Sequence, residues 1–138
     1  MSQDQLYNDA IIALARSNHR AGRLARPDRS TTCDNPLCGD RVTIDVQLAG
    51  DKVAELAQKT RGCLLTQAAA SLIGQHASGL TAETAQRVRV ELERLLSGEA
   101  LEPTWQELGV FAPVRAVKSR HECVLLPFRA LAEALDRA

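Results

Sequence analysis

The sequence predicts an α+β protein in which a small antiparallel sheet carries helices packed on one face. Residues 41–48 alternate strictly between apolar and polar side chains, which is typical of a strand with one buried side. Turn-forming residues at 49–52 and a second short segment at 53–60 predict that this strand continues into a hairpin. Segments before and after the hairpin repeat apolar residues at helical spacing. The order of helix, hairpin and helices therefore indicates an α+β layout.

The bulk properties favour a soluble domain and exclude some partners. A chain of 138 residues fits one compact domain, which we expect to span residues 1–138. Basic and acidic residues both number 17, so the basic surplus that phosphate binding needs is absent and nucleic acid is not expected as a partner. The first residues do not resemble a signal peptide, and no apolar run is long enough to span a membrane. We therefore expect a cytoplasmic protein without a membrane partner.

The helices are predicted from their apolar spacing and end signals. A first helix is expected at 5–20, followed by a loop at 22–37 that is rich in Gly, Pro, Asp, Ser and Asn. An Ala-rich segment at 66–77 predicts a second helix. A third is expected at 81–97, with Thr81 as its N-cap.

The C-terminal part combines an irregular stretch with a last helix. Residues 99–112 lack a regular pattern, and we expect Trp105 to pack this stretch against the domain. Apolar residues at helical spacing predict a helix over 123–137. Pro127 is compatible with that helix only in its first turn, where a missing N–H removes no hydrogen bond.

The chain contains four cysteines, and three of them lie where elements meet. Cys38 precedes the first predicted strand, Cys63 lies between hairpin and helix, and Cys123 opens the last helix. In a reducing compartment four cysteines indicate metal or redox chemistry more than disulfides. There is no Cys-x-x-Cys pair, which argues against a zinc ribbon or a thioredoxin-type site. Helix starts also favour a thiolate, because they carry partial positive charge.

An acidic residue stands beside the first of these cysteines. Asp40 follows Cys38 across Gly39, whose conformational freedom lets a thiolate and a carboxylate point at one ion. The spacing of the cysteines alone leaves a second interpretation open, because unpaired cysteines are often small buried hydrophobes.

Three motifs around the cysteines resemble those of the U-type iron–sulfur assembly proteins (SufU, IscU and the N-terminal domain of NifU). They are NPLCGD at 35–40, RGC at 61–63 followed by TQAAASLI, and RHEC at 120–123 followed by VLLPFRAL. The resemblance covers nearly the whole chain and implies the fold of that family.

Within the family the chain looks more like the SufU branch. The stretch between the second and third motifs is long, and Arg120 stands three residues before Cys123. IscU proteins instead place a His directly before this cysteine, where this chain has Glu122. The second motif departs from the usual Gly-x-Gly-Cys, because Thr60 stands in place of the first Gly.

The resemblance implies a site and an activity. SufU-type proteins bind zinc through three Cys and one Asp and accept persulfide sulfur from a pyridoxal-phosphate cysteine desulfurase. Carried over, the Zn²⁺ ligands are Cys38, Asp40, Cys63 and Cys123, and Cys38 is the sulfur acceptor. The chain would then be a zinc-dependent sulfurtransferase in iron–sulfur cluster assembly. Its further partners would be apo iron–sulfur proteins or other assembly factors.

Two other functions use the same residues. The site could hold a transient [2Fe–2S] cluster as a scaffold, or a structural zinc ion in an adaptor without sulfur chemistry. Three thiolates and a carboxylate overcompensate a dication, so the candidate supporting cations are Arg120, Arg41 and Arg61. Each of them is otherwise a plain surface residue. His121 is either an alternative ligand or a surface residue at a helix start. Cys33 is either a sulfur relay or a free loop thiol.

Overall fold

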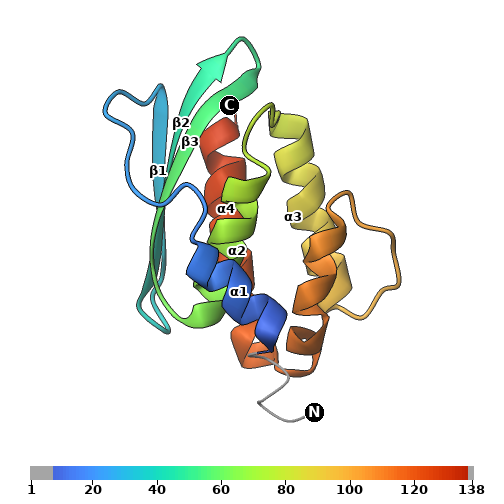
Figure 1. The fold of residues 1–138 in the computed structure, drawn as a ribbon. Helices are drawn as coiled ribbons and strands as arrows, with labels where there is room; N and C mark the ends of the chain where they lie inside the picture. Colours follow the sequence, from blue (N-terminus) through green and yellow to red (C-terminus); the bar gives the residue numbers. More distant parts are fainter. Residues whose placement is uncertain (1–7, 137–138) are drawn as a thin grey trace.

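The computed structural model describes residues 8–136 and has a three-stranded antiparallel sheet with its helices on one face (Figure 1). This confirms the predicted fold class. The strands lie in the order β1-β2-β3. The elements are α1 (Asp9–Ser17), β1 (Arg29–Asn35), β2 (Asp40–Ala49), β3 (Lys52–Arg61), α2 (Leu64–Gln75), α3 (Ala82–Leu96), the 3₁₀ segments η2 (Gln106–Ala116) and η3 (Lys118–Arg120), and α4 (His121–Leu135).

The core lies between the sheet and the helices α2 and α4. Both helices are buried over most of their length, as expected for helices covered on more than one side. The helix α1 packs on α2, and α3 packs on α4 on the side that faces away from the sheet (Figure 1). No helix within residues 8–136 is long and apolar enough to cross a membrane.

Strand β2 has one apolar side, as its alternation predicts. Val42, Ile44 and Val46 are fully buried on the helix side of the sheet. Arg41 lies on the opposite side, which we refer to as the outer face, and is exposed. The register with β3 shifts between Gln47 and Leu48, and Leu48 beyond this shift is only partly buried.

Strand β1 lies inside the segment that we expected to be a loop at 22–37, so that prediction was wrong. Its sequence, RSTTCDN, has no apolar alternation, because its helix-facing side chains reach polar partners on α4 and at its C-cap. Arg29 donates a hydrogen bond to the carbonyl of Asp136 at 2.9 Å, and the Cys33 thiol donates to the Glu133 carboxylate at 3.3 Å. A strand with polar partners on both faces carries no hydrophobic period.

The segment after α3 is more regular than expected. Residues 106–116 form 3₁₀ structure where we predicted an irregular stretch over 99–112. Trp105 is buried, as predicted, and stacks on the His76 ring at 4.3 Å between ring centroids. His76 is also hydrogen-bonded to Glu107 over 2.8 Å, so this ring ties the segment to the end of α2.

The helix ends differ from the predictions by a few residues, and this difference has a structural consequence only at the start of α4. The part of the first helix predicted at 5–7 and the end of the last at 137 lie outside the described residues. Helix α4 begins at His121 rather than at 123, so Pro127 lies beyond the first turn. The proline lacks the N–H that would bond the carbonyl of Cys123, which leaves that carbonyl without its usual helical donor.

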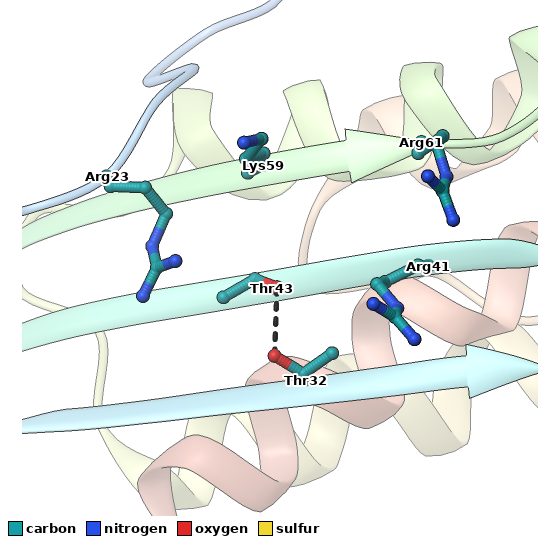
Figure 2. A pocket seen from close by; sticks show the side chains of 6 residues that line it. All are labelled: Arg23, Thr32, Arg41, Thr43, Lys59 and Arg61. Atoms are coloured by element: carbon teal, nitrogen blue, oxygen red, sulfur yellow. Dashed lines mark hydrogen bonds between the residues drawn. The ribbon is translucent and has the colours of Figure 1, made fainter.

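The chain between α1 and β1 closes the free edge of β3. The Gly22 N–H donates to the Gln58 carbonyl, and the Gln58 N–H donates to the Arg20 carbonyl, both at 2.9 Å. These bonds lead the chain around the edge of the sheet, so that Arg23 lies on the outer face (Figure 2).

On the outer face, Arg23 covers a buried carboxylate. Asp45 is fully buried and accepts hydrogen bonds from Arg23 Nε at 2.6 Å, Ser30 Oγ at 2.5 Å and the Leu24 N–H at 3.1 Å. Burial raises the pKa of Asp45, but these hydrogen bonds outweigh it and leave the pKa below its ordinary value. The ionised carboxylate of Asp45 therefore holds the chain segment at Arg23 and Leu24 against β2.

We expect the variant Asp45→Asn to be less stable than the parent protein by about 1–3 kcal/mol near neutral pH, because charge-assisted hydrogen bonds are lost. A carboxyl whose folded pKa is lowered stabilises the fold above its unfolded pKa of about 3.9, and this contribution disappears as the pH falls through the folded value. The difference between the two proteins should therefore shrink in acid. Urea unfolding between about pH 3 and 7 measures it. Asp51→Asn, in the exposed turn before β3, is the control, and a pH-independent difference would contradict this account.

Candidate metal centre

Three elements bring the predicted ligands to one end of the sheet. They are the turn between β1 and β2, the start of α2 and the start of α4 (Figure 1). The ligand atoms of Cys38, Asp40 and Cys123 all lie within 4.8 Å of one another. Cys63 does not meet this distance to all three, but its thiol is hydrogen-bonded to Cys123. The fold thus brings together side chains that are far apart in the sequence.

The β1–β2 turn presents Cys38 to solvent and directs Asp40 inward. The Asn35 side chain accepts from the Leu37 N–H at 3.1 Å, and its carbonyl accepts from the Gly39 N–H at 2.8 Å. Gly39 has a φ of +73°, a left-handed conformation that glycine adopts without strain. Cys38 is exposed, whereas Asp40, at the start of β2, is only 4% exposed.

The Asp40 carboxylate is held between two residues near the start of α2. Thr66 Oγ1 donates to Asp40 Oδ2 at 2.7 Å and also lies 3.5 Å from Cys63 Sγ. On the other side the carboxylate packs on the Gly62 backbone, where a Cβ would come within 2.8 Å of Asp40 Cγ and Oδ1. Glycine is therefore needed at 62 for a steric reason, since its backbone does not have a positive φ.

The two helix starts surround the buried sulfur. Cys63 is the N-cap of α2, and Cys123 lies in the first turn of α4, where the helix dipoles favour negative charge. Burial, together with the charges of Cys63 and Asp40, raises the pKa of the Cys123 thiol to about 12, although a hydrogen bond from Arg120 lowers it. Arg120 thus contacts the site, as a supporting cation would.

The donor set suits a soft or borderline cation. Three sulfurs and one carboxylate match the tetrahedral sites of zinc and the thiolate sites of iron–sulfur clusters. Sulfur ligands disfavour magnesium and calcium, which prefer oxygen. A cation would also offset the charges of Cys63 and Asp40, which oppose the ionisation of Cys123. The residues present therefore fit a bound zinc ion or a cluster.

Two other predicted residues have partners away from this cluster. His121 Nε2 lies 3.1 Å from the carbonyls of Val114 and Arg115, so this nitrogen faces η2. Cys33 faces Glu133 on α4, and burial together with that carboxylate raises the pKa of its thiol to about 11.

Sequence reasoning missed the roles of Gly62 and Thr66. Gly62 lies within the RGC motif at 61–63, but its contact with Asp40 forms only when this motif packs against the start of β2. A weak signal existed for Thr66: it stands three residues after the N-cap Cys63, in the first turn of α2 on the side of the site.

Comparison with known proteins gives a consistent result. The family model of the NifU-like N terminal domain matches residues 6–109. The iron–sulfur cluster assembly scaffold protein IscU of Streptococcus pyogenes serotype M1 is 26% identical over 98% of this chain and 86% of the relative. The zinc-dependent sulfurtransferase SufU of Bacillus subtilis (strain 168) is also 26% identical, over 97% of this chain and 92% of the relative.

Solved structures agree in fold. A nitrogen-fixing NifU-like protein (N-terminal) from Brucella abortus has a TM-score of 0.88 and 34% identity, over 95% of this chain and 92% of that one. A putative iron–sulfur cluster assembly scaffold protein for the SUF system from Fervidobacterium islandicum AW-1 has a TM-score of 0.90 at 24% identity, over 98% of this chain and 100% of that one, which shows the shared fold. The motifs, the fold and the family match together establish that this chain belongs to the NifU-like N-terminal domain family, the family of the U-type iron–sulfur assembly proteins.

Proposed function

We propose that this chain serves iron–sulfur cluster assembly as a zinc-dependent sulfur acceptor for a pyridoxal-phosphate cysteine desulfurase. The observation that carries the proposal is the contrast between the exposed thiol of Cys38 and the buried Asp40 and Cys123 behind it. The name of the Bacillus subtilis relative supports it. Zinc would be held by Cys38, Asp40, Cys63 and Cys123.

The metal, when bound, supplies positive charge that keeps the cysteines as thiolates near neutral pH. The chain's own residues supply the remaining features. Thr66 and Gly62 hold the Asp40 carboxylate in place, and Arg120 donates to Cys123. Cys123 is 1% exposed and lies beyond the reach of a partner's sulfur.

Sulfur transfer is a nucleophilic displacement at sulfur. The Cys38 thiolate attacks the terminal sulfur of the persulfide on the donor protein, and a new S–S bond forms on Cys38. The S–S bond of the donor breaks, and the donor cysteine leaves as a thiolate. The transfer needs no external oxidant or reductant, because one persulfide is exchanged for another.

A second function, a scaffold for a [2Fe–2S] cluster, uses the same donor set. The name of the Streptococcus pyogenes relative supports it, and three cysteines with one aspartate are compatible with cluster ligation. Metal content separates the two functions: tightly held zinc after purification favours the acceptor, and iron with labile sulfide favours the scaffold.

Replacing the exposed thiol tests the acceptor directly. After incubation with a cysteine desulfurase and cysteine, we expect Cys38→Ser to carry at least about tenfold less persulfide than the parent protein, because the accessible nucleophile is gone. Intact mass under non-reducing conditions measures the bound sulfur. Cys33→Ser is the matched control and should be modified normally. If Cys38→Ser accepts as much sulfur as the parent, the acceptor assignment is wrong.

A methyl group at residue 62 should weaken metal binding. Its Cβ would lie 2.8 Å from the Asp40 carboxylate and displace it, so we expect Gly62→Ala to lose about 10- to 100-fold in zinc affinity, as when a residue that orients a ligand is changed. Competition with a chromophoric chelator measures the affinity. Gly109→Ala, where nothing lies within 4 Å of the added Cβ, controls for the change of residue type. Equal affinities in both variants would remove Asp40 from the ligand set.

The hydroxyl of Thr66 should also matter for metal affinity. Thr66→Val keeps the shape of the side chain but removes the hydrogen bond to Asp40, and we expect about a tenfold loss of zinc affinity. Thr66→Ser restores the hydroxyl and should recover most of it. A Thr66→Val protein that binds zinc as tightly as the serine variant would show that this hydrogen bond does not position the carboxylate.

A further inference from the structure

Basic side chains gather on the outer face of the sheet. They surround a shallow hollow of about 330 Å³ whose floor is formed by two threonines that are hydrogen-bonded to each other at 2.9 Å (Figure 2). The residues of this basic patch are Arg23, Arg41, Lys59 and Arg61, around Thr32 and Thr43. The helices lie on the other side of the sheet, so the patch faces solvent.

Two of the four cations lack a carboxylate partner. Arg41 pairs with Asp34 at 2.6 Å, and Arg23 pairs with Asp45 at 2.6 Å. Within residues 8–136, Lys59 and Arg61 form no ion pair. Arg61 also lies directly opposite Arg41 in the β2–β3 ladder, an arrangement of like charges that is unfavourable by itself. An added negative charge would relieve it.

The unpaired cations match an extended acidic chain. Lys59 and Arg61 are two residues apart on β3, so both point to the outer face, about 6.7 Å apart along the strand. Carboxylates at alternate positions of an extended segment have the same spacing. The patch has no aromatic side chain for base stacking.

The patch reaches the candidate metal centre. Arg41 follows the buried Asp40, and Arg61 stands two residues before Cys63. Alternation along the strands puts Asp40 on the helix side and these cations on the outer face. The turn that carries Cys38 lies at this end of the sheet, and Leu37 beside it is 91% exposed. A protein docked on the patch would therefore lie next to the exposed thiol.

We propose that the basic patch docks an extended acidic segment of the protein that exchanges sulfur with Cys38, with alternate carboxylates paired to Lys59 and Arg61. This inference rests on the proposed function, because it assumes that the docked protein is the sulfur donor. Charge pairs at the edge of an interface raise the association rate and are sensitive to salt, so docking should weaken as ionic strength rises.

The double variant Lys59→Glu/Arg61→Glu tests the inference, with Lys52→Glu/Arg16→Glu as a control that makes the same change of residue types. Lys52 lies at the opposite end of the sheet, and Arg16 lies on α1. The first probe is a fluorescent peptide of alternating Glu and Ser, compared by anisotropy with a Gln–Ser peptide. The parent and control proteins should bind the acidic peptide, and the test variant should bind it about tenfold more weakly, as expected for two surface charge pairs.

The second readout is sulfur transfer from a cysteine desulfurase to Cys38. The donor concentration for half-maximal transfer should rise about tenfold in the test variant and stay unchanged in the control. Thermal unfolding checks that the test variant is folded, which we expect because Glu at 61 would face Arg41.

The outcomes separate the two proposals. If the parent protein accepts no sulfur on Cys38, the proposed function fails, while peptide binding still tests the patch. If transfer occurs but the test and control variants behave alike in both assays, the docking inference is overturned. It is also overturned if inorganic phosphate at low millimolar concentration displaces the peptide, because the patch would then be a small-anion site.

Discussion

The structure depends on burying one carboxylate beside three sulfurs. Asp40 is 4% exposed, and Thr66 donates a hydrogen bond to it. Burial of a charged carboxylate is costly unless it is paired or binds a metal. A cation at this point would compensate Asp40, Cys63 and Cys123 together. Metal binding and the packing of the β1–β2 turn against the two helix starts should therefore be coupled.

Much of the fold could be predicted from the sequence, for reasons that single elements make clear. Strand β2 has one apolar side, so its period of two is visible. Strand β1 pairs with β2 along its whole length but was missed, because its inward side chains, such as Arg29 and Cys33, meet polar groups of α4. A period of two in apolar residues predicts a strand that packs on a hydrophobic core. It does not predict a strand whose inward side chains form polar contacts.

The site could be predicted only in part from its residues. The Cys38–Asp40 proximity follows from local sequence, but residues 38, 63 and 123 meet only through the tertiary fold. The spacing of these cysteines in the sequence does not indicate that they lie close together. That inference came from the resemblance of the surrounding motifs to a known family. Gly62 and Thr66 both contact Asp40 from more than twenty residues away in the sequence. The separation is 26 residues for Thr66. No local pattern encodes such contacts.

The alternation of strands β2 and β3 separates two chemical tasks across a single sheet. Asp40 and Arg41 are neighbours on β2, but Asp40 faces the helices and Arg41 faces solvent. Asp40 thus lies behind the sheet near the buried Cys123, and the cations of the outer face lie in front of it. The turn at Cys38 projects beyond the end of the β1–β2 ladder, and its thiol is exposed. On the proposed function, a sulfur donor docked on the outer face would therefore meet the exposed thiol of Cys38 before the buried Cys123.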